Sequence, residues 1–159
     1  MESARDATPA DIDRLVELAR ELRGELREMR GGALWEVRES RIQPVVDMFE
    51  QLLARDDAVV LVGTIDELVF GYATLEYEPL GEAGTLGVIG DLFVEPDARA
   101  VGVGEALVTE LVARAEAAGC IGLDAFALPG HRAAKNFFER AGFTARALLM
   151  HKPFSNPGT

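Results

Sequence analysis

The chain of 159 residues contains one cysteine, Cys120, and two histidines, and no part of it is apolar for the roughly 20 residues that a membrane-spanning helix needs. A single cysteine excludes an internal disulfide, and no group of cysteines and histidines has metal-ligand spacing. The first thirty residues are charged throughout, which argues against a secretory signal peptide. These absences predict a cytoplasmic protein that folds without a disulfide, a metal or a membrane.

Basic residues are also scarce, because 16 Lys and Arg oppose 27 Asp and Glu and leave a net charge of −11. Phosphate backbones are bound by clustered Lys and Arg, so this balance argues against a nucleic-acid-binding protein. The excess of acidic over basic residues is unevenly distributed along the chain. Residues 58–98 hold no basic group and 8 acidic ones, whereas residues 99–159 hold 7 basic and 5 acidic groups. The middle of the chain therefore suits a cationic ligand and the C-terminal part a polyanionic one, provided that both face one cleft.

Apolar residues make up 48% of the chain, which at this length supports one core. No repeat divides it, so we expect one domain over residues 1–159, with residues 155–159 frayed. Residues 31–40 are typical of a loop. Apolar spacing and β-branched runs predict helices at 12–29, 45–53, 103–118 and 132–140 and strands at 58–65, 68–76, 85–94, 121–128 and 143–150. This order indicates an α/β domain with a mixed sheet, antiparallel at first and with one parallel crossover between strands 85–94 and 121–128.

A glycine-containing loop follows strand 85–94 and leads into the next helix. Gly102 and Gly104 let the backbone approach a ligand, and the free amides of the first helical turn lie at the positive end of the helix dipole, where phosphate binds. The loop is not a Walker A motif, because no Gly-Lys-Ser/Thr follows. It meets the dinucleotide pattern G-x-G-x-x-G only in part, because Leu107 takes the place of the third glycine, and the loop is too long for that fold's tight first turn.

The six residues Arg99-Ala100-Val101-Gly102-Val103-Gly104 resemble the Q/R-x-x-G-x-G/A signature of the GNAT superfamily of N-acetyltransferases. The preceding Leu92-Phe93-Val94 and the later segment 132–143, which ends in Gly-Phe, resemble further landmarks of that family in the same order. The resemblance covers about residues 85–150. It implies a mixed, mostly antiparallel sheet of about six to seven strands, splayed at its middle strands and flanked by about four helices.

The resemblance also implies acetyl-CoA as the acyl donor, with no metal. The pyrophosphate is then expected on the loop amides, and the pantetheine arm along the splayed strand, whose unpaired backbone groups it satisfies as an added strand does. Arg99 is a candidate for the phosphate charge, and Asn136 for the pantetheine arm. The residues expected at the donor are Leu92, Phe93, Val94, Arg99, Ala100, Val101, Gly102, Val103, Gly104, Glu105, His131, Asn136 and Phe138.

The implied reaction is attack by a primary amine on the thioester, for which a base must remove a proton. Asp91 is the first candidate for that base, because some relatives carry an acid just before an apolar-aromatic-Val run. Strand alternation places Val88, Gly90 and Leu92 on one face and Asp91 on the other, so a bulge is needed to re-aim Asp91. A strand-end carboxylate held by backbone amides is the alternative role of Asp91.

Other residues have weaker cases for a role at the acceptor. Glu76, Glu78 and Glu95 are secondary candidates for the base, and Glu76 and Glu78 are better suited to set the sign of the acceptor site. Trp35 is a candidate wall of the acceptor pocket, with a place in the core as its alternative.

The residue expected to act as the acid is missing from its usual place. The family's usual tyrosine is replaced here by Phe138, so the thiolate leaves unassisted or through water, or His131 protonates it.

Together these observations predict an acetyl-CoA-dependent N-acetyltransferase that acts on a small cationic amine. They predict no nucleic-acid or membrane partner and leave a homodimer open. The alternative is a CoA-binding module or regulator without turnover, favoured by Phe138 and by Gly90, where some relatives carry Glu.

Overall fold

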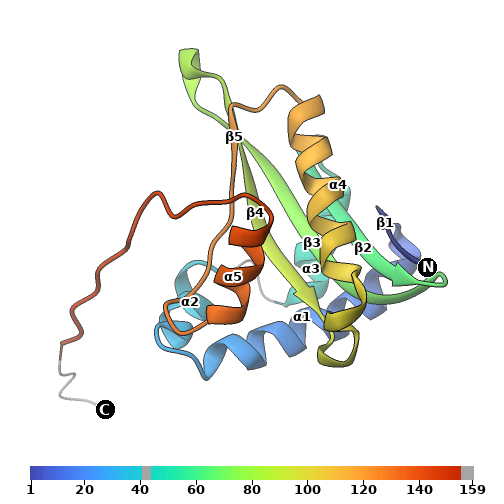
Figure 1. The fold of residues 1–159 in the computed structure, drawn as a ribbon, viewed down its shortest axis with the longest axis horizontal. Helices are drawn as coiled ribbons and strands as arrows, with labels where there is room; N and C mark the ends of the chain where they lie inside the picture. Colours follow the sequence, from blue (N-terminus) through green and yellow to red (C-terminus); the bar gives the residue numbers. More distant parts are fainter. Residues whose placement is uncertain (41–43, 155–159) are drawn as a thin grey trace.

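The computed structural model describes residues 1–40 and 44–154, so the predicted fraying of residues 155–159 lies outside the described residues. Its centre is a five-stranded sheet in the order β1-β2-β3-β4-β5 (Figure 1). Neighbouring strands are antiparallel except β4 and β5, which are parallel. The strands are β1 (Glu2–Asp6), β2 (Ala58–Ile65), β3 (Leu68–Pro79), β4 (Thr85–Val94) and β5 (Gly122–Asp124).

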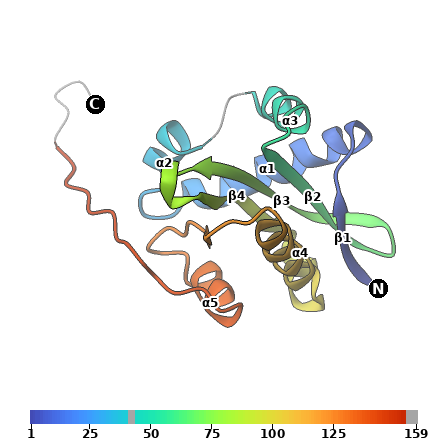
Figure 2. The ribbon, with the colours of Figure 1, turned by 90° about the horizontal axis from the view of Figure 1, so that it is seen from above.

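Helices cover both faces of this sheet (Figure 2). On one face lie α1 (Ile12–Arg27), α2 (Gly32–Arg38) and α3 (Val45–Leu53), and on the other lie α4 (Val103–Ala117) and α5 (Arg132–Arg140). Short 3-10 turns occur at η1 (Pro9–Asp11), η2 (Gly81–Ala83) and η3 (Pro96–Val101). Each face has its own apolar core, because alternate residues of β2 and β3 point to opposite sides.

Several elements are those that the sequence predicts. Strand β4 and helices α3 and α5 have the predicted bounds, and the parallel crossover β4-α4-β5 is confirmed. The predicted hairpin turn between β2 and β3 is formed by Asp66 and Glu67, which both have a positive φ, at 48° and 73°. Such φ values are those of the tight turns that match the twist of a hairpin.

Other elements differ from the prediction. Strand β1 was missed because it is an edge strand with almost no buried side chain. The predicted loop 31–40 contains helix α2, which begins after Gly31 in the left-handed conformation. The predicted strand 121–128 is reduced to β5, and residues 143–150 form no strand. The expected sheet of six to seven strands with about four helices is therefore wrong in number, since the described residues form five strands and five α-helices.

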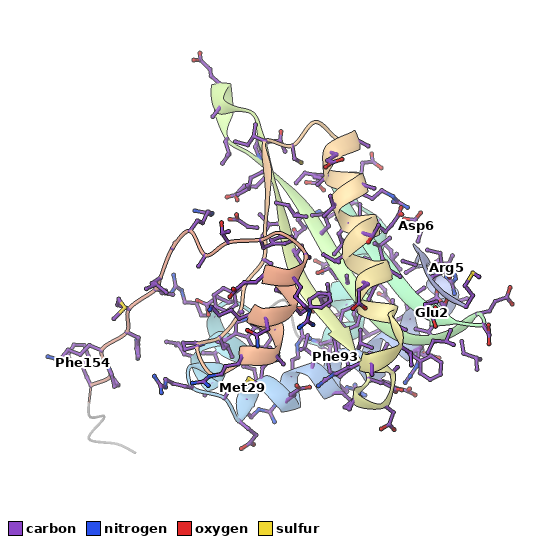
Figure 3. The ribbon with its side chains drawn as sticks, in the orientation of Figure 1. Glu2, Arg5, Asp6, Met29, Phe93 and Phe154 are labelled. Atoms are coloured by element: carbon purple, nitrogen blue, oxygen red, sulfur yellow. The ribbon has the colours of Figure 1, made fainter. Side chains whose placement is uncertain are left out.

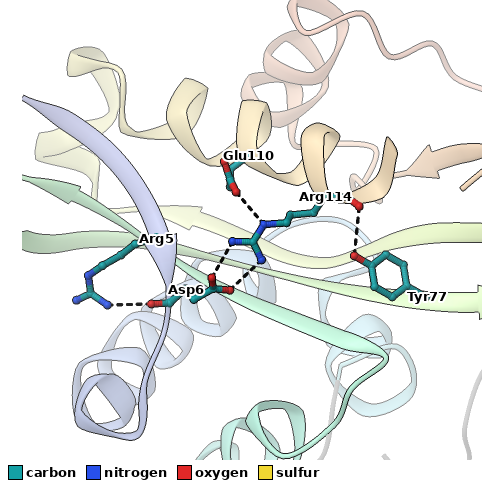
Figure 4. A network of polar contacts seen from close by, with 5 residues as sticks. All are labelled: Arg5, Asp6, Tyr77, Glu110 and Arg114. Atoms are coloured by element: carbon teal, nitrogen blue, oxygen red, sulfur yellow. Dashed lines mark hydrogen bonds and ion pairs between the residues drawn. The ribbon is translucent and has the colours of Figure 1, made fainter. Parts of the chain in front are cut away.

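An ion-pair network fastens β1 to α4 (Figure 4). Both terminal nitrogens of Arg114 donate to the Asp6 carboxylate, at 2.9 and 2.7 Å, and its Nε donates to Glu110 at 2.8 Å. The Arg114 guanidinium lowers the pKa of the Asp6 carboxyl below its ordinary value. Through Arg114 the charged edge strand is tied to the helix that begins at the glycine loop.

Candidate functional site

Strands β4 and β5 separate after a short stretch of pairing. They pair only over Leu86–Val88 and Gly122–Asp124, whereas β4 continues to Val94. A pocket occupies this divergence. The strands therefore splay, but between the last two strands of the sheet and not between its middle strands as expected. It is lined by Leu22, Leu26, Trp35, Ile89, Gly90, Asp91, Leu92, Phe126, Ala127, Leu128, His131, Ala134 and Phe138.

A β-bulge in β4 directs Asp91 to the side of the sheet that α1 covers. The register with β3 shifts by one, so that Gly90 and Asp91 together oppose Thr74. The Asp91 amide donates to Thr74 Oγ1 at 2.9 Å. Ile89 and Leu92 both pack in the α4-side core although they are an odd number of positions, three, apart. The prediction that Val88 and Leu92 share a face is therefore wrong. The bulge that would re-aim Asp91 is therefore present.

The Asp91 carboxylate is buried between two polar side chains. The Tyr72 hydroxyl donates to Asp91 Oδ2 at 2.8 Å, and Arg23 Nη1 lies 3.6 Å from the same oxygen. Burial first, and then the negative charge of Asp91, hold the pKa of Tyr72 well above its ordinary value. Tyr72 is therefore a permanent hydrogen-bond donor to this carboxylate.

Arg23 connects Asp91 to the aromatic wall of the pocket. Its terminal nitrogens donate to the Ala19 carbonyl at 3.2 Å and to Met48 Sδ at 3.6 Å, while its buried Nε has no partner. Its guanidinium carbon lies 6.0 Å from the centroid of the Trp35 ring. Arg23 is not among the predicted site residues, although an arginine within the apolar stripe of a predicted helix is a sign of a buried charge.

Arg99 lies in η3, at the start of the glycine loop, and its side chain contacts α1. Its Nε donates to the Val94 carbonyl at 2.8 Å, and its Nη2 donates to Glu25 at 2.7 Å. The other oxygen of Glu25 is 3.9 Å from His131 Nε2. Burial lowers the pKa of His131, Glu25 raises it and Arg99 lowers it. Glu25 therefore lies between Arg99, which was predicted to bind phosphate, and His131, which lines the pocket.

The glycine loop has the backbone geometry of an anion site. Gly102 has φ +95° and immediately precedes α4, and Ala106 donates to its carbonyl at 3.0 Å. The amides of residues 103–105 therefore lie in the first turn, where helical amides lack acceptors within the helix. A Cβ on Gly104 would lie 3.1 Å from the Phe137 ring, so glycine lets α5 pack against the start of α4.

The remaining predicted residues are not all at the pocket. Trp35 and Phe138 line it, and Phe138 also packs against Phe143, with ring centroids 5.2 Å apart. Asn136 is exposed on α5 and is not among the lining residues.

The three secondary carboxylates lie elsewhere. Glu76 pairs with Arg55 at 2.7 Å and Glu95 with Arg14 at 2.5 Å, while Glu78 is exposed. Among residues 1–40 and 44–154, no cluster of His, Cys, Asp and Glu is arranged to hold a metal ion, and no helix has the length and apolarity to cross a membrane.

Several solved structures share this fold at low sequence identity. Ribosomal-protein-alanine N-acetyltransferase from Brucella melitensis superposes with a TM-score of 0.72 at 17% identity, over 98% of this chain and 100% of that one. Glucosamine-6-phosphate N-acetyltransferase from Arabidopsis thaliana gives 0.71 at 20% identity, over 98% and 99%. AAC(6')-Iy, in complex with the bisubstrate analogue CoA-S-monomethyl-acetylneamine, gives 0.71 at 14% identity, over 97% and 99%.

Sequence comparison gives a family-level result. No curated protein matches this chain significantly. The sequence model of the acetyltransferase (GNAT) family, whose members use acetyl-CoA, matches residues 15–143, which contain the splayed strands, the bulge and the glycine loop. The chain therefore belongs to the GNAT acetyltransferase family.

Proposed function

We propose that this protein is an acetyl-CoA-dependent N-acetyltransferase that acts on a small primary amine in the pocket between β4 and β5. The observation that carries the proposal is the bulge, which turns Asp91 to the α1 side of the sheet, where it and Trp35 both line that pocket. A carboxylate at the point where two strands diverge places a proton acceptor where an extended thioester and an amine can meet.

The residues of this chain fit the donor. Glu95 donates its amide to Phe70 on β3, so the Val94 carbonyl of the same peptide unit points to the opposite, open edge of β4, where Arg99 donates to it. Open-edge backbone groups are suitable partners for the amides of pantetheine. The first-turn amides after Gly102 are suitable for its pyrophosphate. When bound, acetyl-CoA supplies an activated acetyl thioester.

Asp91 has the role of proton acceptor in this proposal. The ammonium form of the acceptor loses a proton to the Asp91 carboxylate, directly or through water, and the free amine nitrogen then attacks the thioester carbonyl carbon. The carbon–nitrogen bond forms, the carbon–sulfur bond breaks, and the thiolate leaves with its electron pair. The attacking nitrogen releases its second proton, which the thiolate takes up directly or through water. Thiolates are weakly basic, so this departure does not require the hydroxyl that Phe138 lacks.

The preference for a small cationic acceptor follows from charge. Residues 58–98, which include β3 and β4, carry no basic side chain, and Trp35 lines the pocket with an aromatic ring. Glu76 is paired with Arg55 and Asp91 with Arg23, so the attraction comes from the negative charge of residues 58–98 as a whole. The names of the three solved structures refer to different acceptors, so they indicate no single acceptor for this chain.

A binding module without turnover is the second candidate, and the Arg23 contact is the observation that favours it. Arg23 lies 3.6 Å from Asp91, so the main role of this carboxylate in a binding module would be to form an ion pair with Arg23. Phe138 also has no proton to donate to a leaving thiolate.

One experiment separates the two functions. Release of the CoA thiol from acetyl-CoA is followed with a panel of cationic and neutral primary amines, while calorimetry measures CoA binding. Thiol release that depends on an amine supports the enzyme. Binding without release for the whole panel supports the module, and the absence of binding overturns both.

A further inference from the structure

One carboxylate of α1, that of Glu25, lies between the start of the glycine loop and the pocket. Its two oxygens face different residues: Oε2 accepts from Nη2 of Arg99 in η3 at 2.7 Å, and Oε1 lies 3.9 Å from Nε2 of His131 at the start of α5. A separation of 3.9 Å is too long for a hydrogen bond. Glu25 is therefore bonded to Arg99 and stands only within ion-pair reach of the imidazole.

The His131 imidazole lines the pocket and is not used by the helix that it begins. His131 is the N-cap residue of α5, but its side chain makes no capping hydrogen bond. Burial lowers the pKa of this imidazole, Glu25 of α1 raises it and Arg99 of η3 lowers it. Whether His131 holds a proton therefore depends on which partner Glu25 has.

Other charged side chains around His131 are paired or exposed. Asp91 of β4 lines the same pocket, but it is paired with Arg23. On α5 itself Arg132 and Lys135 are exposed. The other residues that line the pocket are uncharged. The carboxylate from α1 and the guanidinium from η3 are thus the charges that act on this imidazole.

Arg99 has its present contacts where the donor is expected. Its Nε donates to the Val94 carbonyl at 2.8 Å, an open-edge group that is also suited to pantetheine. Its guanidinium carbon lies 5.4 Å from the centroid of the Phe93 ring, near the end of β4 (Figure 3). The attraction of a cation to an aromatic ring does not depend on one hydrogen-bond partner. Arg99 is thus able to exchange Glu25 for a phosphate and keep its contact with Phe93.

We propose that the diphosphate of the donor takes Arg99 from Glu25, and that Glu25 then pairs with His131, which holds the proton for the leaving thiolate. The exchange rests on the proposed function, because it requires acetyl-CoA at the glycine loop. A diphosphate carries more negative charge than one carboxylate and therefore competes well for a guanidinium. It also offsets the positive charge of Arg99, which otherwise opposes protonation of His131. Both effects favour a charged imidazole when the donor is bound.

The proton balance of the reaction assigns different roles to the two residues. The imidazolium of His131 donates its proton to the thiolate as the carbon–sulfur bond breaks, and the imidazole becomes neutral. It then takes up the second proton that the attacking nitrogen releases, so that His131 carries this proton in place of water. His131 is the acid in this scheme, whereas Glu25 acts only through His131 and is a positioning residue.

The first test follows the His131 imidazole by nuclear magnetic resonance with and without saturating CoA. We expect CoA to raise the pKa of His131, so that the imidazole binds its proton about tenfold more tightly, a usual effect of an opposite charge at this distance. The exposed His151 serves as an internal reference. The rise should be much smaller in Glu25→Gln. Glu21→Gln, at an exposed position one turn earlier on α1, should keep it in full.

The second test is the dependence of kcat on pH, which reports the groups of the complex with substrates. An acid must be protonated to act, so kcat falls as the pH rises through the pKa of His131 in that complex. Because Glu25→Gln lowers this pKa, we expect the fall to begin at lower pH in that variant. Glu21→Gln should leave the profile unchanged, and His131→Gln should remove this fall.

Three results overturn the proposal. The first is a pKa of His131 that stays constant or decreases when CoA binds, and the second is an equal rise in Glu25→Gln and the unmodified protein. The third is a fall of kcat at the same pH in these two proteins. Calorimetry on the same samples records CoA binding. Binding without a change at His131 overturns this proposal alone, whereas the absence of binding overturns the proposed function as well.

Discussion

The hydroxyl of Tyr72 donates to Oδ2 of Asp91 across two strands that are one residue out of step at this point. In a regular ladder Asp91 would face the α4 side of the sheet, away from Tyr72. The bulge therefore does two things, because it opens the edge of β4 at the pocket and places the carboxylate beside Tyr72 and Arg23. The bulge thus determines both the position of the candidate base and its two polar partners.

Replacement of Asp91 tests its role as the base. We expect Asp91→Asn to lower kcat by about 100-fold or more, the usual contribution of a general base, with acetyl-CoA affinity nearly unchanged. Steady-state kinetics and calorimetry measure the two quantities. Asp13→Asn, at an exposed position of α1, is the matched control. A pH–rate profile that is identical for Asp91→Asn and the unmodified enzyme would remove Asp91 from the mechanism.

Replacement of Arg23 tests the buried ion pair. Arg23→Met keeps an unbranched apolar side chain but leaves the Asp91 carboxylate buried with only Tyr72 as its polar side-chain partner. We expect the free energy of unfolding to fall by about 3 kcal/mol, which is typical when one partner of a buried pair is removed. Urea denaturation measures this change. Arg20→Met, on the exposed side of the same helix, should change it by less than about 0.5 kcal/mol, and equal effects would contradict the pairing.

The glycine loop is tested by a charge placed at its turn. Gly102→Glu combines a strained positive φ with a carboxylate at the expected phosphate position, so we expect acetyl-CoA affinity to fall by about 100-fold or more. Gly119→Glu is a matched control, because Gly119 also has a positive φ, +75°, but lies beyond the other end of α4. Calorimetry compares the two variants after their melting temperatures are recorded. A similar loss of affinity in both would refute the loop as a phosphate site.

Prediction from the sequence succeeded where local chemistry determines the structure. The β-branched run of β2, the Asp66-Glu67 turn and the Gly102 loop are each specified by a few adjacent residues. Strand β1 was missed because its sequence, Glu-Ser-Ala-Arg-Asp, has no apolar alternation, and its stability comes from β2 and from Arg114 of the distant α4. Tertiary contacts of this kind leave no mark on a short window of sequence.

The candidate site was predicted only in part for the same reason. The sequence identified Asp91, Trp35, His131 and Phe138, which all line the pocket. It assigned no pairing to Arg99, which pairs with Glu25 across 74 positions of the chain. It named Gly90 as a departure from relatives and stated that a bulge at this point would re-aim Asp91, and Gly90 and Asp91 do form that bulge.

The contact between Glu25 and His131 predicts a change in titration. Burial and the Arg99 guanidinium lower the pKa of the His131 imidazole, while the Glu25 carboxylate raises it. Glu25→Gln removes the raising influence, so we expect the pKa of His131 to fall further. Nuclear magnetic resonance of the imidazole protons measures it, and His131→Gln assigns the signals, since only two histidines are present. A pKa that rises or stays constant in Glu25→Gln would contradict the contact.

The same lowered pKa predicts how stability depends on pH. The unfolded chain binds a proton at His131 near an ordinary value of about 6.5, whereas the folded chain binds it only at lower pH. This contribution to stability is therefore fully present above about pH 6.5 and is lost as the pH falls toward the folded value. The free energy of unfolding is measured by denaturation at several pH values below about 6.5 for the unmodified protein and for His131→Gln. The difference between the two proteins gives the contribution of His131. If this difference does not change with pH, the titration of His131 contributes nothing to stability.

Phe138→Tyr tests whether the leaving thiolate lacks a proton donor. The Phe138 ring lines the pocket and packs between Phe137 and Phe143, so a phenol oxygen at its tip adds one polar atom while the ring contacts are kept. We expect stability to change by less than about 1.5 kcal/mol and kcat to equal or exceed that of the unmodified enzyme. Phe143→Tyr, which modifies the neighbouring ring outside the set of lining residues, should leave kcat unchanged. A gain confined to Phe138→Tyr would show that protonation of the thiolate limits turnover, whereas a loss in that variant alone would show that the pocket requires an apolar wall at this position.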